Sequence, residues 1–148
     1  MRPKFWKLSQ GTAFFDYNSI LESIEHRLVY VHKDTAAKGG SRKSQGQQFI
    51  EAPIGDYFYL THGNAGIYLL GQFAGPTNIF SARREGWLDR PFRFIKASIL
   101  KESYNGPKKW WTPNEDSTFS PVPDSEVKLF EQYILKPYFN ISLSDFGL

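Results

Sequence analysis

Cysteine is absent from this chain of 148 residues, and no apolar run approaches the length of a membrane span. Without cysteine there is no disulfide and no cysteine-based zinc site. This composition suits a reducing compartment, so we expect a cytoplasmic protein. A transmembrane helix needs about 20 consecutive, mostly apolar residues, and the basic N-terminus lacks the apolar segment of a signal peptide. We therefore expect no membrane partner.

Motifs for nucleotide hydrolysis and metal binding are also missing. The glycine-rich stretch 38–44 lacks the G-x-x-x-x-G-K-[ST] pattern that holds phosphates. His26, His32 and His62 do not have the spacing of a zinc site. The carboxylates within 123–128 have the residue types of a metal-dependent nuclease, but at a helix start they act as cap and dipole partners. We expect no metal, no cofactor and no catalytic residue.

Aromatic residues are abundant, at 17% of the chain, and the sequence pI is about 9.1. Net positive charge favours anionic partners. Aromatic rings combined with lysine and arginine suit the stacking of bases together with contacts to phosphate. The alternative is that the rings fill the core of a small β-rich domain and the cations are ordinary surface residues.

Apolar periodicity predicts one α+β domain over residues 1–148, built on a small barrel or a strongly curved sheet. The expected strands are 4–8, 28–32, the two arms of a hairpin within 55–76, and 91–99. A helix is expected at 18–28, with Asp16, Asn18 or Ser19 as its cap. A last helix is expected from Asp124 or Ser125 until Pro137 stops it. Residues 33–48 contain one long loop in this prediction.

Basic residues gather in three connections between the expected strands, two of which also contain tryptophan. If these loops meet at one rim, their cations could contact phosphates, with an affinity that falls as salt rises. The candidates for phosphate contact are Lys33, Lys38, Arg42, Lys43, Arg83, Arg84, Arg90, Lys108 and Lys109. Trp87, Trp110 and Trp111 are either stacking residues or core residues, and we expect at least one of them in the core.

The order of these segments resembles the YTH and EVE families of the PUA-like superfamily. The resemblance covers nearly the whole chain and rests on "KFWKLSQG", "LVYVHKDT", "GDYFYLTHGNAGIYLLGQFAGP" and "GWLDRPFRFIKASI". It implies a small β-barrel with flanking helices and a pocket for one extruded base. EVE-like domains of McrB-like restriction proteins look like sensors of modified DNA bases. In those proteins a separate GTPase and a nuclease cut the DNA, so the resemblance implies that such activities belong to a partner or to a following domain.

Carried onto this sequence, the resemblance implies a base pocket beside the end of the first strand, at Lys7 and Ser9. Tyr30 and His32 fall on the strand that supplies a cage aromatic in YTH domains, and Trp87 falls near the second cage position. YTH domains have tryptophan where this chain offers Tyr30 or His32, so a modified cytosine fits the expectation as well as N6-methyladenine does. At the hairpin tip, Asn64 either turns the chain or reads the edge of the base.

The expected function is therefore a non-enzymatic domain that binds a modified base, with DNA favoured over RNA. An RNA-binding domain of the same superfamily is one alternative. A second is an enzyme that uses His32, His62 or Asp56 as acid or base. A third is a protein-interaction module with exposed tryptophans.

Overall fold

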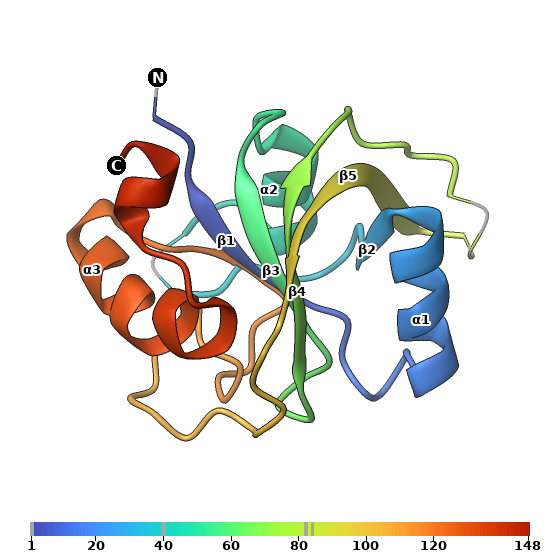
Figure 1. Ribbon diagram of the computed structural model, residues 1–148. Helices are drawn as coiled ribbons and strands as arrows, with labels where there is room; N and C mark the ends of the chain where they lie inside the picture. Colours follow the sequence, from blue (N-terminus) through green and yellow to red (C-terminus); the bar gives the residue numbers. More distant parts are fainter. Residues whose placement is uncertain (1, 40, 82, 84) are drawn as a thin grey trace.

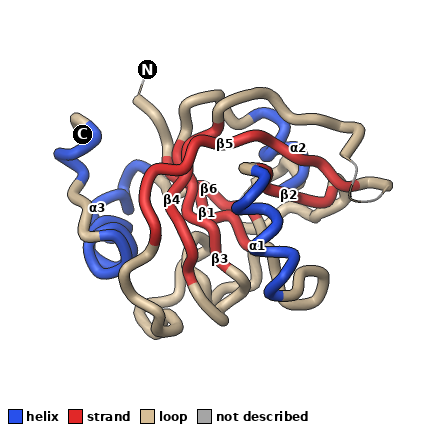
Figure 2. The backbone as a smooth tube through the Cα atoms, turned by 45° about the vertical axis from the view of Figure 1, so that its right-hand side comes forward, coloured by secondary structure: helices blue, strands red, loops and turns tan. Residues whose placement is uncertain are grey.

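The computed structural model describes residues 2–39, 41–81, 83 and 85–148. A strongly curved sheet of six strands forms its centre, in the order β2-β5-β4-β3-β1-β6 (Figures 1 and 2). Only β1 and β3 run parallel; the other neighbours are antiparallel. The expected α+β fold on a curved sheet is confirmed. The strands are β1 (Phe5–Ser9), β2 (Leu28–His32), β3 (Tyr57–Thr61), β4 (Ile67–Phe73), β5 (Trp87–Ala97) and β6 (Phe119–Pro121).

Helices flank this sheet on different sides. In Figure 1, α1 lies at the right beside β2, whereas α3 and the turns that follow it lie at the left, near both termini. Within the described residues, no helix is long and apolar enough to cross a membrane. The helical segments are α1 (Tyr17–His26), α2 (Gln45–Glu51), η1 (Asp124–Glu126), α3 (Val127–Phe130), the π-helix η2 (Glu131–Phe139) and η3 (Leu143–Phe146).

Strand β5 joins the edge strand β2 to the rest of the curved sheet. Its first half pairs with β2, and its second half, from Phe92 onward, pairs with β4. The β4–β5 register shifts between Leu70 and Gly71. A Cβ on Gly71 would lie 2.7 Å from the Phe58 ring and 3.0 Å from Phe92, so glycine permits this close packing where the sheet bends. The bend leaves the outer face of the β2–β5 ribbon next to α1.

Strand β1 is buried on both faces because hydrophobic cores lie on either side of it. Trp6 and Leu8 belong to the core that α2 covers, whereas Phe5 and the neighbouring Tyr59 belong to the core under α3 and η2. Lys7 alternates with Trp6 and Leu8 and therefore points to the Phe5 side. The Lys7 side chain thus lies buried on the same face of the sheet as the core under α3 and η2.

Three expectations about the elements are wrong. The end of the expected loop is helical, because α2 begins at Gln45 with Ser44 as its cap. Strand β6 was missed, since three residues carry almost no periodic signal. Pro137 does not stop the last helix, which continues to Phe139. Tyr138 and Phe139 are both buried, and this packing outweighs the helix-breaking tendency of Pro137.

Candidate nucleic-acid interface

The outer face of the β2–β5 ribbon carries two ring side chains from β2 and one from β5. In the antiparallel register, His32 stands opposite Trp87 and Tyr30 stands opposite Asp89. The His32 ring meets the Trp87 ring edge-on, with 5.2 Å between centroids. Gly86 allows this contact, since a Cβ there would lie 2.6 Å from Nε2 of His32. The structure thus brings the three predicted aromatic candidates of the base pocket together.

Phe15 completes this aromatic group from the start of α1. Asp16 caps the helix by accepting from the Ser19 amide at 2.8 Å, and Phe15 and Ile20 on either side of the cap share one cluster. This is the arrangement of a hydrophobic staple, which fixes how the chain enters the helix. The centroid of the Phe15 ring lies 5.3 Å from that of the Trp87 ring and 6.3 Å from that of the Tyr30 ring. We call Phe15, Tyr30 and Trp87 the aromatic site.

The guanidinium of Arg83 covers the aromatic site. Its Cζ lies 3.8 Å from the centroid of the Phe15 ring, 5.2 Å from Trp87 and 5.8 Å from Tyr30. Its Nη2 also donates to the Phe14 carbonyl at 2.5 Å. Cations are attracted to ring faces at these distances. A planar cation therefore already lies over the Phe15 ring, close to the other two rings of the site.

Burial raises the pKa of the Tyr30 phenol, and the Asp89 carboxylate adds to this rise although the Arg83 cation opposes it. The phenol therefore stays protonated at neutral pH and keeps its O–H as a donor. A cleft of about 360 Å³ opens beside the site, lined by Ser19, Glu22, Ser23, His26, Tyr30 and Arg83. Cavities of roughly 300–1,000 Å³ hold small ligands. The rings offer stacking, and the polar lining offers hydrogen bonds to a ligand edge.

Gln10 holds the floor of this site, although the sequence analysis did not single it out. Its side chain is fully buried, donates to Ser23 Oγ at 3.0 Å and accepts from the Tyr30 amide at 3.0 Å. It therefore ties α1 to β2 just beneath the cleft. Buried amides are nearly always paired in this way. The sequence carried little signal for this role, since Gln10 follows a strand that itself contains the polar residues Lys7 and Ser9.

The tip of the β3–β4 hairpin supports the aromatic site from below. His62 is 8% exposed, and its Nε2 lies 2.6 Å from the Phe15 carbonyl, so the ring nitrogen donates there. Ser9 Oγ accepts from the Gly63 amide at 3.2 Å. Asn64 exchanges two hydrogen bonds with the backbone of Tyr104, at 2.9 and 3.0 Å. The tip thus fastens neighbouring loops as well as turning the chain.

Replacing His62 by alanine is expected to lower the free energy of unfolding by about 1–3 kcal/mol, because the Phe15 carbonyl loses its buried donor. Urea denaturation followed by circular dichroism measures this. His26→Ala, at an exposed position of α1, is the control and should change stability by less than about 0.5 kcal/mol. Equal stability of both variants would contradict the supporting role of His62.

Three solved structures share the architecture described above. Human THYN1 in complex with 5-methylcytosine-containing DNA matches with a TM-score of 0.53 and 12% identity, over 87% of this chain and 96% of that chain. The protein Atu2648 from Agrobacterium tumefaciens matches with a TM-score of 0.52 and 14% identity, over 84% of this chain and 88% of that chain. The YTH domain of Zygosaccharomyces rouxii MRB1, in complex with N6-methyladenosine RNA, matches with a TM-score of 0.50 and 10% identity, over 88% of this chain and 86% of that chain. The chain has a YTH/EVE-like fold.

At 10–14% identity these likenesses establish the YTH/EVE-like fold alone. No protein-family model matches the chain, and no curated protein matches its sequence. The fold that the sequence resemblance implied is therefore confirmed by structure rather than by sequence comparison.

Within the YTH/EVE-like fold, three of the predicted pocket residues lie away from the aromatic site. Lys7 is 1% exposed and donates to the Glu115 carbonyl at 2.8 Å and to Ser117 Oγ at 2.9 Å. Ser9 and Asn64 are engaged at the hairpin tip. The alternation of β1 places Lys7 on the face under α3, whereas the aromatic site belongs to the β2–β5 ribbon. These residues support the fold around the site.

Arg90 does not fit its predicted phosphate contact, because it is 1% exposed. It alternates inward with Leu88 and Phe92 on β5, and its guanidinium donates to the Gly75, Phe49 and Ala52 carbonyls at 2.6–3.1 Å. Its role in the structure is to join β5 to the C-terminal end of α2 and to the loop after β4. Arg84 lies outside the described residues.

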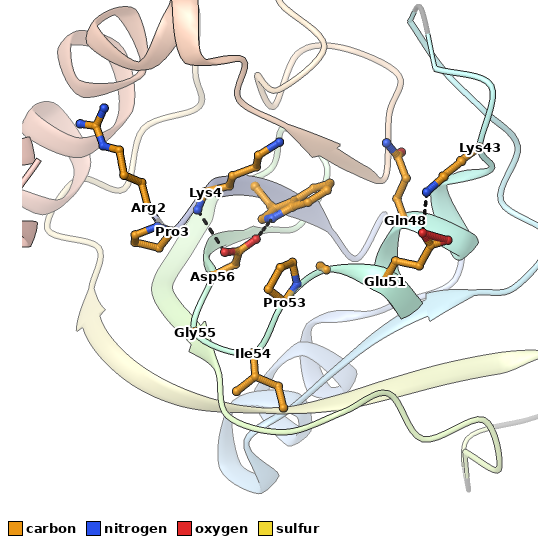
Figure 3. Close-up of a pocket in the computed structure, with 12 residues that line it drawn as sticks. Arg2, Pro3, Lys4, Lys43, Gln48, Glu51, Pro53, Ile54, Gly55 and Asp56 are labelled. Carbon is orange, nitrogen blue, oxygen red and sulfur yellow. Dashed lines mark hydrogen bonds and ion pairs between the residues drawn. The ribbon is translucent and has the colours of Figure 1, made fainter.

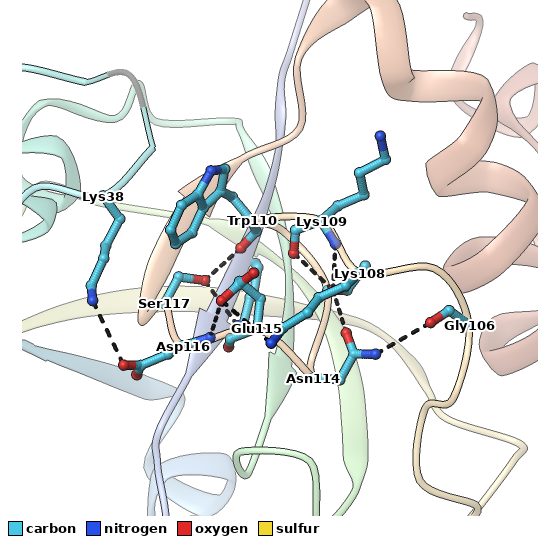
Figure 4. Close-up of polar contacts among 11 residues, drawn as sticks. Lys38, Gly106, Lys108, Lys109, Trp110, Asn114, Glu115, Asp116 and Ser117 are labelled. Atoms are coloured by element: carbon cyan, nitrogen blue, oxygen red, sulfur yellow. Dashed lines mark hydrogen bonds and ion pairs between the residues drawn. The ribbon is translucent and has the colours of Figure 1, made fainter.

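The other predicted phosphate contacts fall into separate places. Lys33 is beside the aromatic site, because its amide donates to the Gly86 carbonyl at 2.8 Å, and Arg83 covers that site. Lys38, Lys108 and Lys109 lie around Trp110 (Figure 4). Their amines are 3.6, 4.0 and 3.1 Å from carboxylates of Asp116, Glu115 and Glu126. Such exposed pairs are weak, and phosphate contacts at these lysines stay a prediction.

A larger cavity, of about 670 Å³, lies elsewhere, between the N-terminal segment and α2 (Figure 3). Lys43 lines it, 2.5 Å from Glu51, and exposed Arg42 precedes Lys43 in the chain. Among the described residues that line it, Trp6 is the one aromatic ring, and it already stacks on Phe119 at 4.3 Å. The smaller cleft is lined by Tyr30, whose ring belongs to the same cluster as Phe15 and Trp87.

The residues of the enzyme alternative are held in separate structural contacts. The Asp56 carboxylate is 4% exposed and accepts from the Lys4 amide and from Nε1 of Trp6. His62 bonds to Phe15, and Nδ1 of His32 accepts from the Asp34 amide. The described residues also hold no group of three or more potential metal ligands. No shared acid–base arrangement connects these three side chains in the described residues.

The four tryptophans differ in exposure. Trp111 is a core residue, at 1% exposed, and its Nε1 donates to Glu126 at 2.8 Å, so the expectation of at least one core tryptophan is confirmed. Trp110 is 43% exposed. One exposed indole is a small patch for a protein-interaction module that relies on several tryptophans.

Proposed function

We propose that this chain is a nucleic-acid-binding domain that takes one modified base, extruded from its strand, into the aromatic site. The observation that carries the proposal is the guanidinium of Arg83, whose Cζ lies 3.8 Å from the centroid of the Phe15 ring and within about 6 Å of the Tyr30 and Trp87 ring centroids. Rings that hold one planar group can hold another. The entering base displaces the guanidinium, which can then turn to a backbone phosphate.

The polar lining of the cleft suits the edge of a base with an exocyclic amine. The Glu22 carboxylate can accept from such an amine, and the Ser19 and His26 side chains can bond to the neighbouring ring atoms. Both 5-methylcytosine and N6-methyladenine present an amine hydrogen. A buried methyl group adds a discrimination of about 1–3 kcal/mol. Structures of the same fold that hold 5-methylcytosine DNA or N6-methyladenosine RNA support the proposal.

In this proposal the chain binds DNA in preference to RNA and has no catalytic activity of its own. It is the sensor of a modification-dependent restriction system, and the GTPase and nuclease belong to a partner or to a following domain. The resemblance to the EVE-like sensors of McrB-like proteins supports this part of the proposal.

The test is to measure dissociation constants for matched DNA duplexes and RNA strands, plain or carrying one modified base, by fluorescence anisotropy at two salt concentrations. The wild type should prefer one modified base, and Trp87→Ala should weaken that complex about tenfold or more, from the stacking of about 1–3 kcal/mol per base. Trp87→Phe, which keeps a ring, should lose less.

Trp110→Ala is the matched control, since Trp110 lies outside the aromatic site. It should keep the ratio of affinities for modified and plain strands, because contacts outside the pocket weaken all sequences alike. Circular dichroism confirms that each variant is folded. If the wild type binds none of these nucleic acids, the proposal is wrong.

A further inference from the structure

Two phenylalanine side chains near the aromatic site face solvent rather than a core. Phe80 is 85% exposed, the largest value among the large apolar side chains of the described residues, and Phe14 is 64% exposed. Ile79, beside Phe80, is 60% exposed. Exposed apolar groups that gather at one place often mark an interaction surface.

Phe14 lies beside the aromatic site, and Phe80 lies on the loop that carries Arg83. The Phe14 ring meets the Trp87 ring edge-on at 5.9 Å, and its carbonyl accepts from Arg83. Phe80 precedes Arg83 by three residues, so their Cα atoms are at most about 11 Å apart. The Phe80 amide donates to Oδ1 of Asn78 at 3.0 Å, and Asn78 is bridged to Asp89 of β5. The loop is thereby anchored to the strand that carries the site.

Extrusion of a base from a duplex leaves a gap in the stack of base pairs. Proteins that distort duplexes commonly insert an apolar side chain between base steps, where it replaces lost stacking. A phenylalanine suits this place because its flat ring covers neighbouring base pairs and needs no hydrogen-bond partner. An exposed ring beside a pocket for an extruded base has the position and chemistry required.

We propose that Phe80 enters the base stack of duplex nucleic acid at the position vacated by the extruded base, with Phe14 packing against the adjacent step. This inference rests on the proposed function and goes beyond it, because it assigns a duplex as the bound form and two residues outside the pocket as its wedge. In this arrangement the exposed rings are buried only in the complex.

The experiment compares Phe80→Ala and Phe14→Ala with the wild type on two ligands: a DNA duplex with one 5-methylcytosine or N6-methyladenine, and the same modified strand alone. We expect Phe80→Ala to weaken duplex binding about tenfold and single-strand binding by less than about twofold, because a single strand has no stack to refill. Phe14→Ala should change in the same direction by a smaller factor.

Ile99→Ala is the matched control, because Ile99 is 61% exposed and its amide bonds to Tyr138 on the far side of the sheet. It should bind both ligands like the wild type. Equal weakening of both ligands by Phe80→Ala, or no weakening, overturns the wedge. Wild-type binding of modified single strands without duplex binding also overturns the wedge and leaves the proposed function intact. Binding of neither ligand by the wild type overturns the proposed function, and the wedge with it.

A second measurement, of base stacking in the bound duplex, tests the wedge independently of affinity. With 2-aminopurine next to the modified base, unstacking raises the fluorescence of the duplex on binding of the wild type. Saturating Phe80→Ala should give a larger increase than saturating Ile99→Ala, because no ring then refills the stack beside the 2-aminopurine. The same increase with both variants overturns the wedge.

Discussion

Replacing Arg90 by alanine is expected to lower the free energy of unfolding by about 3–5 kcal/mol, since the carbonyls of Phe49, Ala52 and Gly75 lose buried donors together. The change also removes the packing of the guanidinium, whose Cζ lies 4.1 Å from the Phe73 ring centroid. Domains of this size are stable by about 5–15 kcal/mol in total. Urea denaturation followed by circular dichroism gives the value.

Arg93→Ala on the same strand is the control, because Arg93 is exposed and bonds to Gln72 at the surface. It should change stability by less than about 0.5 kcal/mol. Arg90→Lys keeps a cation but has one amine in place of the fork that joins the end of α2 to the loop after β4, so its free energy of unfolding should lie between those of Arg90→Ala and the wild type. A loss below about 1 kcal/mol for Arg90→Ala would show that other contacts hold these loops.

Stability is expected to rise with pH above neutrality because of Lys7. Burial lowers the pKa of its amine from the ordinary value of 10.5 to about 7, although Glu115 and Asp116 oppose the shift. Below about pH 7 the amine is protonated in both the folded and the unfolded chain, and the folded chain bears the full cost of a buried charge. Between about pH 7 and 10.5 only the unfolded chain binds this proton, so the free energy of unfolding rises by at most about 1.4 kcal/mol per pH unit.

The measurement is the free energy of unfolding of the wild type and of Lys7→Met between pH 6.5 and 9.5. The difference between the two proteins should change across this range, because methionine has no proton to release. Lys128→Met, at an exposed lysine, should run parallel to the wild type. The slope of the difference is the test, since methionine also removes the bonds to Glu115 and Ser117. A constant difference would show that Lys7 keeps its proton in the folded chain.

The elements that the sequence predicted are those with a local signal. The hairpin, β2 and α1 with its Asp16 cap follow from alternation, helical spacing and a capping side chain within a few residues. Helix α2 has a weaker signal, since it contains Gly46. Tertiary packing explains that glycine, because a Cβ there would lie 2.3 Å from the Lys33 carbonyl. Contacts of this kind cannot be read from a periodic pattern.

The candidate site was predictable in part. Tyr30, His32 and Trp87 were named together, and the β2–β5 pairing places them on one face. Phe15 carried a signal that was missed, namely an apolar residue just before a helix cap with Ile20 inside the first turns. The cover by Arg83 was not predictable, because the loop that carries it has no regular structure.

Charge alone was a poor guide to surface location. Arg90 was assigned to phosphate, yet Leu88 and Phe92 on either side of it already indicate the inward face of β5. Lys7 stands in the same relation to its strand, between Trp6 and Leu8 of a segment that is buried throughout. In both cases the buried amine or guanidinium donates to acceptors in segments that are distant in the sequence, which no single segment of the sequence specifies.

The place of β1 between β3 and β6 has a consequence for synthesis on the ribosome. Phe5–Ser9 leaves the tunnel before the other five strands, but one of its edges pairs with Phe119–Pro121, more than a hundred residues later. Until then that edge is exposed in the nascent chain, and an exposed strand edge invites pairing with other chains. Because such distant contacts also slow folding, the last step should wait for the arrival of β6. Truncation before β6 is then expected to yield aggregation rather than a smaller folded domain.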